Sequence, residues 1–323
     1  MPSRPWGEGA VGHAGQADRA GSRGVPRTVQ ECATRPSRDA RSAGGEGGDP
    51  DGPVVVGVGD RGVAESALAW AVFQAQRHRR PVHLVHAVPH ADDVSRAERL
   101  RLESVAAYRL SVAAGLADEL CQGALPVTVE IAEGSAACVL LDHSEQASTV
   151  VVERPRLVVL DQAPAPSVTR GLAAESAAPV VMVPAGWTAS EGDGLVVAAV
   201  GDPTHAGPVL SAAYRASDAF GARVEVVHTW WHADAEPGVR EAVSGSSGGA
   251  VRLVEGRGGD ALVARSFAAD LLVVARPAER ITHGAVPAAV ETALYEAVCP
   301  VLVVAPGQSS GLLRPRRSLS VVR

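Results

Sequence analysis

The sequence contains no lysine, because all 30 of its basic residues are arginine. This absence excludes mechanisms that need a lysine side chain, such as a Schiff base or the phosphate-binding lysine of a P-loop or a protein kinase. Cysteine is also scarce: the chain has 4 cysteines in 323 residues, and none belongs to a Cys-x-x-Cys pair. We therefore expect buried or incidental thiols and no redox or zinc centre built on cysteine.

Other absences narrow the function further. No apolar run approaches the roughly 20 residues of a transmembrane helix, and the N-terminus has no signal-peptide core. We therefore expect a cytoplasmic protein that does not bind membranes. The net charge of −6 gives no basic surface for nucleic acid. Because no nucleophile motif and no metal-ligand spacing is present, we expect neither an enzyme nor a metal site.

What the sequence does contain is an internal repeat. The first copy begins with a valine-rich segment that ends in Gly-Val-Gly-Asp, and 142 residues later a similar segment ends in Ala-Val-Gly-Asp. Three positions share this offset: Gly59 and Gly201, Asp60 and Asp202, His86 and His228. Two later motifs recur at the shorter offsets of 122 and 121 residues: Glu133-Gly134 with Glu255-Gly256, and Pro179-Val180 with Pro300-Val301. The shorter offsets indicate that the second copy has lost about one helix between its second and third strands.

The repeat divides the chain into four parts. Residues 1–52 are rich in Gly, Arg, Ser, Ala and Pro, and we expect a disordered tail because such a segment cannot offset its ordering entropy. Residues 53–185 form the first domain. Residues 194–306 form the second, shortened domain. Residues 307–323 are expected to be a flexible tail.

Both copies alternate β-branched apolar runs with amphipathic helical patterns, as expected of parallel strands that are buried on both faces. The first copy predicts strands at 54–58, 81–88, 127–131, 149–152 and 180–183, with helices at 65–79, 95–120, 135–145 and 168–176. The second copy predicts strands at 195–200, 224–228, 251–254, 271–274 and 301–304, with helices at 206–220, 260–267 and 288–297.

These motifs, in this order and duplicated, resemble the universal stress protein family in its tandem form. The motifs are Val56-Gly57-Val58, Leu84-Val85-His86-Ala87, Glu133-Gly134-Ser135-Ala136, Ala269-Asp270-Leu271-Leu272 and Cys299-Pro300-Val301-Leu302. The resemblance implies an α/β fold of two tandem Rossmann-like (adenine nucleotide alpha hydrolase-like) domains, each a five-stranded parallel sheet flanked by helices. It also implies pairing through the last strands, either between the domains of one chain or in a homodimer.

ATP-binding members of this family resemble one another in an aspartate at the end of the first strand and in a glycine-rich phosphate loop after the fourth. Here the aspartates, Asp60 and Asp202, are displaced by one residue, so each can reach a ribose or cap the following helix. In the loop, Pro166 and Pro287 stand at glycine positions and lack the N–H that a phosphate would need. Glu153 also places a negative charge where a triphosphate would sit.

If a nucleotide does bind, the resemblance places it in the first domain. The residues that would contact it are Gly57, Gly59, Asp60, His86, Val88, Ser167, Val168 and Thr169. His86 and Asp60 have two interpretations, as an acid–base pair or as polar residues at the carboxyl edge of the sheet, where open α/β sheets bind ligands. We assign no catalytic residue and no metal ligand.

The sequence therefore predicts a universal stress protein with degenerate nucleotide sites, which acts as a stress-response binding or regulatory module without a cofactor. One alternative is a weak ATP-binding or ATP-hydrolysing protein that uses the first domain. A second alternative is a structural pseudo-dimer that serves as a scaffold for an unknown protein partner. Exposed apolar surface on the final strands would favour the scaffold.

Overall fold

The computed structural model describes residues 48–60, 63–154, 168–189, 194–201, 206–229, 252–256, 258–276 and 288–305. Several sequence predictions lie outside these ranges. They concern the tails at 1–47 and 306–323, the loop that contains Ser167 and Pro166, the second-copy residues Asp202 and Pro287, and the shortened segment at 230–251.

The first half of the chain forms five strands and four α-helices among the described residues. The strands are β1 (Val54–Gly57), β2 (Val82–Val88), β3 (Val127–Glu133), β4 (Thr149–Arg154) and β5 (Val180–Pro184). The helices are α2 (Glu65–His78), α3 (Arg96–Cys121), α4 (Ala136–Ser144) and α5 (Val168–Glu175), and the short 3-10 helix η1 (Ala91–Asp93) precedes α3.

The second half repeats this order. Its strands are β6 (Leu195–Val200), β7 (Arg223–Thr229), β8 (Arg252–Gly256), β9 (Leu271–Ala275) and β10 (Val301–Val304). Its described helices are α6 (Ala206–Phe220), α8 (Gly258–Ser266) and α9 (Ala288–Glu296). The predicted strands and helices are confirmed, with ends that differ from the predictions by at most two residues.

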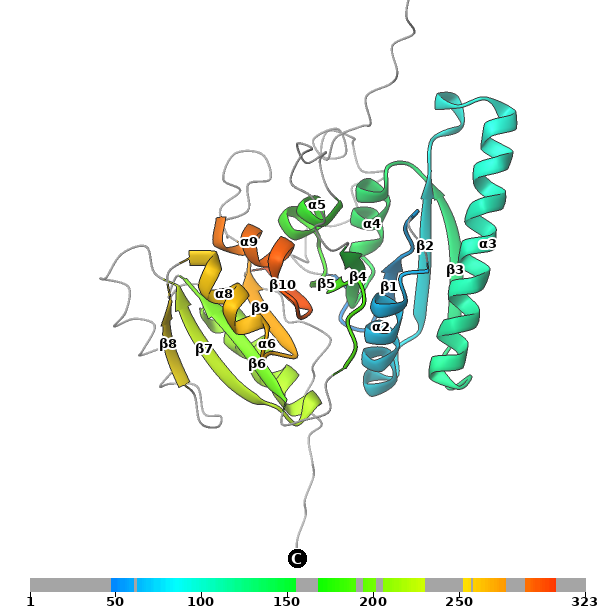
Figure 1. Ribbon diagram of the computed structural model, residues 1–323. Helices are drawn as coiled ribbons and strands as arrows, with labels where there is room; N and C mark the ends of the chain where they lie inside the picture. Colours follow the sequence, from blue (N-terminus) through cyan, green and yellow to red (C-terminus); the bar gives the residue numbers. More distant parts are fainter. Residues whose placement is uncertain are drawn as a thin grey trace, which may run out of the picture.

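All ten described strands form one sheet in the order β3-β2-β1-β4-β5-β10-β9-β6-β7-β8, and Figure 1 shows the two halves side by side. Pairing is parallel within each half and antiparallel where β5 meets β10. The α/β fold with a parallel five-stranded sheet in each half is thus confirmed.

The strands and helices form for reasons that are visible in the sequence. Val54, Val55 and Val56 of β1 are all buried, because helices cover both faces of the sheet. The long helix α3 begins where Ser95 caps it: the Ser95 hydroxyl accepts a hydrogen bond from the Glu98 N–H at 3.2 Å. Its length does not make it a membrane helix, since no described helix is long and apolar enough to cross a bilayer.

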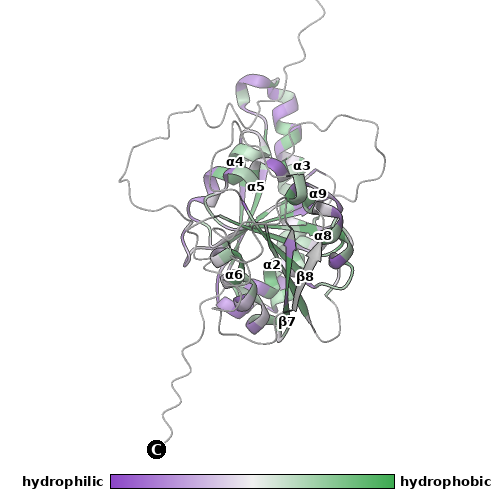
Figure 2. Ribbon diagram, turned by 90° about the vertical axis from the view of Figure 1, so that its left-hand side faces the viewer, coloured by the Kyte–Doolittle hydropathy of each residue, from purple (hydrophilic) through white to green (hydrophobic). Residues whose placement is uncertain are grey.

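The core has one layer on each face of the sheet. Helices α2, α3 and α6 contribute to one layer, and α4, α5, α8 and α9 contribute to the other. Each layer continues across both halves. On the first face, Phe73 of α2 stacks on Phe220 of α6 with ring centroids 5.3 Å apart, and Figure 2 shows these helices on the same side of the sheet.

The contact between the halves is self-complementary. Val181 lies opposite Leu302, and these two residues are equivalent in the repeat at the offset of 121. The pairing therefore has the character of a two-fold interface inside a single chain.

Two equivalent arginines reinforce this contact. Arg154, at the end of β4, is only 4% exposed and donates hydrogen bonds to the backbone carbonyls of Tyr295 and Ala297 at the end of α9. In return Arg276, which follows β9, donates to the Ser176 carbonyl just beyond α5 at 2.9 Å. Both arginines supply donors and positive charge to helix C-termini, whose last carbonyls lack partners within the helix. Burial lowers the pKa of the Arg154 guanidinium.

Residues 48–52 correct one prediction. They were expected to belong to the disordered tail, but the Gly48 N–H donates to the Ala177 carbonyl at 2.9 Å, and Asp51 forms an ion pair with Arg80 at 2.5 Å. The tail prediction is therefore wrong for these residues, because their backbone and carboxylate groups find partners on the domain.

The described cysteines differ in state. Cys121 and Cys299 are buried and free, and burial raises the pKa of the Cys299 thiol to about 12, so this thiol is unreactive at neutral pH. Cys138 is disulfide-bonded, so the expectation of an incidental thiol is wrong for this residue.

We predict that the buried arginine stabilises the joint between the halves. Arg154→Met should lower the free energy of unfolding by about 1–3 kcal/mol, because it leaves buried carbonyls at the end of α9 without donors. Arg276→Met should cost less, since this residue is only partly buried. Urea denaturation measures both changes. The control is Arg101→Met, which removes an exposed ion pair with Glu98 and should cost under about 0.5 kcal/mol. Equal losses in all three variants would contradict the prediction.

Candidate functional site

The predicted site residues of the first half gather at the carboxyl edge of the sheet. Gly57 ends β1, and Gly59 and Asp60 follow it. His86 and Val88 lie in the last three residues of the neighbouring strand β2, which pairs with β1 in parallel. This is the edge where open α/β sheets bind ligands.

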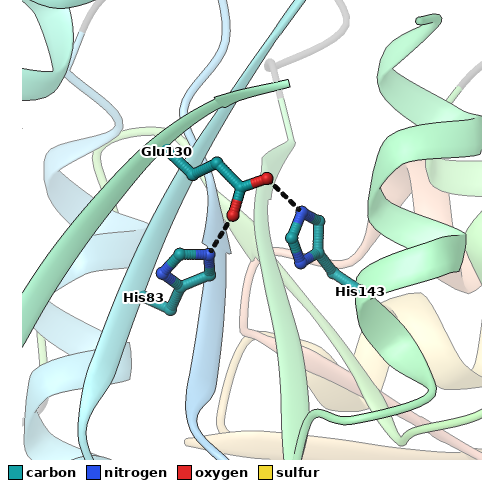
Figure 3. A group of neighbouring side chains, drawn as sticks. All are labelled: His83, Glu130 and His143. Carbon is teal, nitrogen blue, oxygen red and sulfur yellow. Dashed lines mark hydrogen bonds and ion pairs between the residues drawn. The ribbon is translucent and has the colours of Figure 1, made fainter. Parts of the chain in front are cut away.

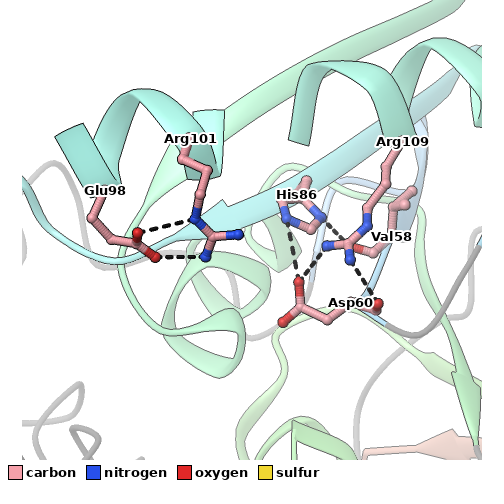
Figure 4. Close-up of polar contacts among 6 residues, drawn as sticks. All are labelled: Val58, Asp60, His86, Glu98, Arg101 and Arg109. Atoms are coloured by element: carbon pink, nitrogen blue, oxygen red, sulfur yellow. Dashed lines mark hydrogen bonds and ion pairs between the residues drawn. The ribbon is translucent and has the colours of Figure 1, made fainter. Parts of the chain in front are cut away.

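Asp60 does not cap the following helix, which was one of its two predicted roles. Its carboxylate instead forms an ion pair with Arg109 of α3 at 2.5 Å, and the other guanidinium nitrogen of Arg109 donates to the Asp60 carbonyl at 2.8 Å (Figure 4). Although Arg109 holds it, the Asp60 side chain is 85% exposed. Sequence reasoning missed Arg109, since 49 residues separate it from Asp60.

His86 lies directly behind this ion pair. Its Nδ1 is 2.7 Å from the Val58 carbonyl oxygen, which can only accept, so Nδ1 carries a proton and donates it. Its Nε2 is 3.8 Å from the Asp60 carboxylate. Figure 4 shows the ring between Val58 and Asp60. The fold therefore fixes the orientation of the ring through Nδ1 and leaves Nε2 facing the Asp60 carboxylate.

The second half repeats this histidine contact. His228 Nδ1 is 2.8 Å from the Val200 carbonyl oxygen, and both residues are displaced by 142 positions from His86 and Val58. The two histidines thus hold together the ends of the first two strands in each half. Both copies thus share a structural role for the histidine at this position.

Glu153 of β4 occupies the start of helix α2. The helix begins after Ala64, whose side chain cannot cap it, and the Ser66 N–H donates to the Glu153 carboxylate at 3.2 Å. Burial raises the pKa of Glu153, and hydrogen bonds from the backbone of Ser66 and Ala67 oppose that rise. The negative charge anticipated from the sequence therefore lies at a helix N-terminus, where free N–H groups and the helix dipole favour an anion.

Gly57 of β1 and Gly59 in the following loop differ in how closely other atoms surround them. A Cβ atom on Gly57 would lie 2.9 Å from Leu140 Cδ1 and 3.1 Å from Val152 Cγ1, so this glycine allows α4 to pack on the sheet. A Cβ atom on Gly59 would meet nothing within 4 Å. Gly57 therefore serves packing, and Gly59 faces open space at the edge.

The remaining predicted residues are less connected. The Val88 carbonyl accepts the Gly134 N–H at 2.8 Å, so the end of β2 is tied to the end of β3. Val168 and Thr169 form the first turn of α5, and Thr169 is buried. Ser167 lies outside the described residues.

A second charged group lies at the end of β3. Glu133 forms an ion pair with Arg99 of α3 at 2.5 Å and lies 3.9 Å from His90. The Arg99 guanidinium is the main cause of a lowered Glu133 pKa. Together with Arg109, Arg99 places two α3 arginines along this edge, and each is paired with a carboxylate of the chain.

We predict different consequences for the two glycines. Gly57→Ala should lower the free energy of unfolding by about 1–3 kcal/mol, because the added methyl group overpacks the contact with Leu140. Gly59→Ala is the matched control and should change stability by under about 0.5 kcal/mol. Thermal and urea unfolding measure both. Similar losses in the two variants would show that packing of α4 does not require Gly57.

We also predict a pH-dependent effect of Glu153. Its pKa is raised in the folded protein, so its contribution to stability is present below the ordinary glutamate pKa and is lost as the pH rises through the raised value. Glu153→Gln removes this titration while keeping an acceptor for the Ser66 N–H. The variant should therefore gain stability relative to wild type between pH 4 and pH 7, measured by urea denaturation. A difference that stays constant over this range would refute the prediction.

Comparison with known proteins agrees with this geometry. Residues 52–184 match the sequence model of the universal stress protein family. A search of curated proteins gives no match. Among solved structures, a universal stress protein from Archaeoglobus fulgidus DSM 4304 superposes with a TM-score of 0.61 at 16% identity, covering 78% of this chain and 98% of the other.

A protein from Pseudomonas aeruginosa UCBPP-PA14, whose name also places it among the universal stress proteins, gives a TM-score of 0.54 at 18% identity and covers 80% of this chain and 94% of its own. At these identities the two structures establish the fold alone. Residues 52–184 therefore combine that fold with a match to the sequence model of the universal stress protein family.

Proposed function

We propose that the chain is a universal stress protein with degenerate nucleotide sites, which acts as a stress-response binding or regulatory module without a cofactor and without chemistry of its own. The observation that carries the proposal is the Glu153 carboxylate at the N-terminus of α2. A helix N-terminus at the carboxyl edge of an α/β sheet is a favourable place for phosphate. Here the carboxylate of the chain takes that place, and a phosphate would meet like charge there.

The state of Asp60 supports the same proposal. Arg109 already satisfies one carboxylate oxygen and the backbone carbonyl of Asp60. A ribose hydroxyl would have to compete with these charge-assisted hydrogen bonds, which are stronger than those between neutral groups. The proline residues at 166 and 287 add to this argument from the sequence, since each removes a backbone donor.

The ATP-binding alternative has one observation in its favour. Asp60 is 85% exposed, so its second oxygen is open to a ligand, and Arg109 brings positive charge to the same edge. The scaffold alternative loses the support that was expected for it, because β5 and β10 are buried and pair with each other. Exposed apolar side chains lie on other segments, among them Tyr108 of α3, Val129 of β3 and Phe267, which follows α8.

Titration calorimetry of ATP with Mg²⁺ into the full chain tests the proposal. We expect no saturable binding at micromolar concentration. The double variant Glu153→Gly with Pro166→Gly removes the competing charge and restores a backbone donor, and we expect it to bind at least about tenfold more tightly than wild type, equivalent to about 1.4 kcal/mol.

Two outcomes would contradict the proposal. A single micromolar site in the wild type, lost in Asp60→Asn and kept in the control Arg101→Ala, would establish the ATP-binding alternative. Measurable affinity that is the same in wild type, Pro166→Gly and Pro287→Gly would refute the argument from the prolines. Circular dichroism confirms that each variant is folded.

A further inference from the structure

Three side chains that the sequence keeps far apart converge beneath helix α4. His83 comes from β2, Glu130 from β3 and His143 from the last turn of α4 (Figure 3). His83 Nε2 is 3.2 Å from Glu130 Oε2, and His143 Nε2 is 3.6 Å from Glu130 Oε1. One nitrogen or oxygen atom from each residue lies within 4.8 Å of the others. The group lies apart from the Asp60 edge, because His83 is near the amino end of β2.

We propose that His83, Glu130 and His143 bind a divalent cation of the zinc type, with a water molecule in the fourth position. Two imidazoles and one carboxylate form a donor set that zinc accepts. Zinc lies about 2.0–2.2 Å from nitrogen and oxygen ligands, so tetrahedral ligand atoms are about 3.3–3.5 Å apart. The separations of 3.2 Å from His83 to Oε2 and 3.6 Å from His143 to Oε1 are close to that value, and the two imidazoles reach different oxygens of the Glu130 carboxylate.

The surroundings suit a cation. His83 Nδ1 is 2.8 Å from Thr128 Oγ1, so it can donate its proton to that hydroxyl and leave Nε2 as a free lone pair toward Glu130. Metal-binding histidines usually hold their second ring nitrogen in this way. His143 lies in the last turn of α4, where the negative end of the helix dipole favours positive charge.

The second half offers an internal comparison at the same place. Glu225 of β7 is equivalent to His83, and Arg265 of α8 is equivalent to His143, at the offsets of 142 and 122. These two form an ion pair at 3.1 Å, and Glu225 is buried. In the second half, a guanidinium of the chain therefore neutralises the carboxylate beneath the helix. In the first half, the carboxylate faces two imidazoles, which can supply positive charge only by protonation or by a shared cation.

The site is also accessible. The side chains of His83, Glu130 and His143 are 18%, 46% and 24% exposed, so an ion can reach them and keep a water ligand. Bound there, it would connect β2, β3 and α4.

The test is Zn²⁺ binding to the full chain, measured by competition with a chromogenic chelator, together with the visible spectrum of the Co²⁺ form. We expect one saturable site per chain and a Co²⁺ spectrum typical of four-coordinate geometry. The variant His83→Glu with His143→Arg introduces the residues of the second-half ion pair beside Glu130, removes both imidazole ligands and should lose this site. Glu130→Gln, which keeps the size and shape of the side chain, should bind more than about tenfold more weakly.

The control His90→Ala changes a histidine outside the cluster and should bind as wild type does. Two results would overturn the proposal: a wild-type protein with no more saturable Zn²⁺ sites than the His83→Glu with His143→Arg variant, or an unchanged affinity in Glu130→Gln. Circular dichroism of the two variants shows whether each is folded, and the two independent substitutions keep the test decisive if one of them fails to fold.

Discussion

The antiparallel pairing of β5 with β10 is the constraint on which the rest of the structure depends. In either half alone, the last strand would be an apolar edge with unpaired backbone groups, which is a template for aggregation. Pairing the two edges buries both strands and joins the core layers on each face. It also explains why the protein can bury Arg154: the guanidinium leaves water only because carbonyls at the end of α9 accept its hydrogen bonds.

At the carboxyl edge too, charged groups are paired with other groups of the same chain. These groups occupy positions where a ligand could bind. Glu153 supplies the anion at the start of α2, and Arg109 supplies the cation beside Asp60. Each contact satisfies polar groups that would otherwise depend on solvent or on a bound molecule. At this edge of the first half, Asp60 and the start of α2 are thus already paired with groups of the chain, which supports the proposal of a module that binds no nucleotide.

The sequence predicted the strands and helices well because their signals are local. Continuous valines mark β1, and Ser95 marks the start of α3. It predicted the contacts poorly, because those depend on residues that only folding brings together. Arg154 meets Tyr295 across 141 positions, and no periodicity encodes that meeting. The sign of the charge at Glu153 was predictable, whereas its partner, the Ser66 N–H, was not. The tail boundary failed for a related reason: a Gly- and Asp-rich composition gives no hint that Gly48 bonds to Ala177.

The sequence analysis assigned no metal ligand because ligand spacing was sought along the chain, whereas His83, Glu130 and His143 come from two strands and a helix. The repeat shows what this cluster implies. The second half fills the equivalent positions with Glu225 and Arg265, so the fold itself does not require histidine there. A direct ion pair already balances the charge and packs beneath the helix. The fold therefore does not dictate two imidazoles and a carboxylate at this point in the first half, and the affinity of imidazole for divalent metals supports the proposed cation site.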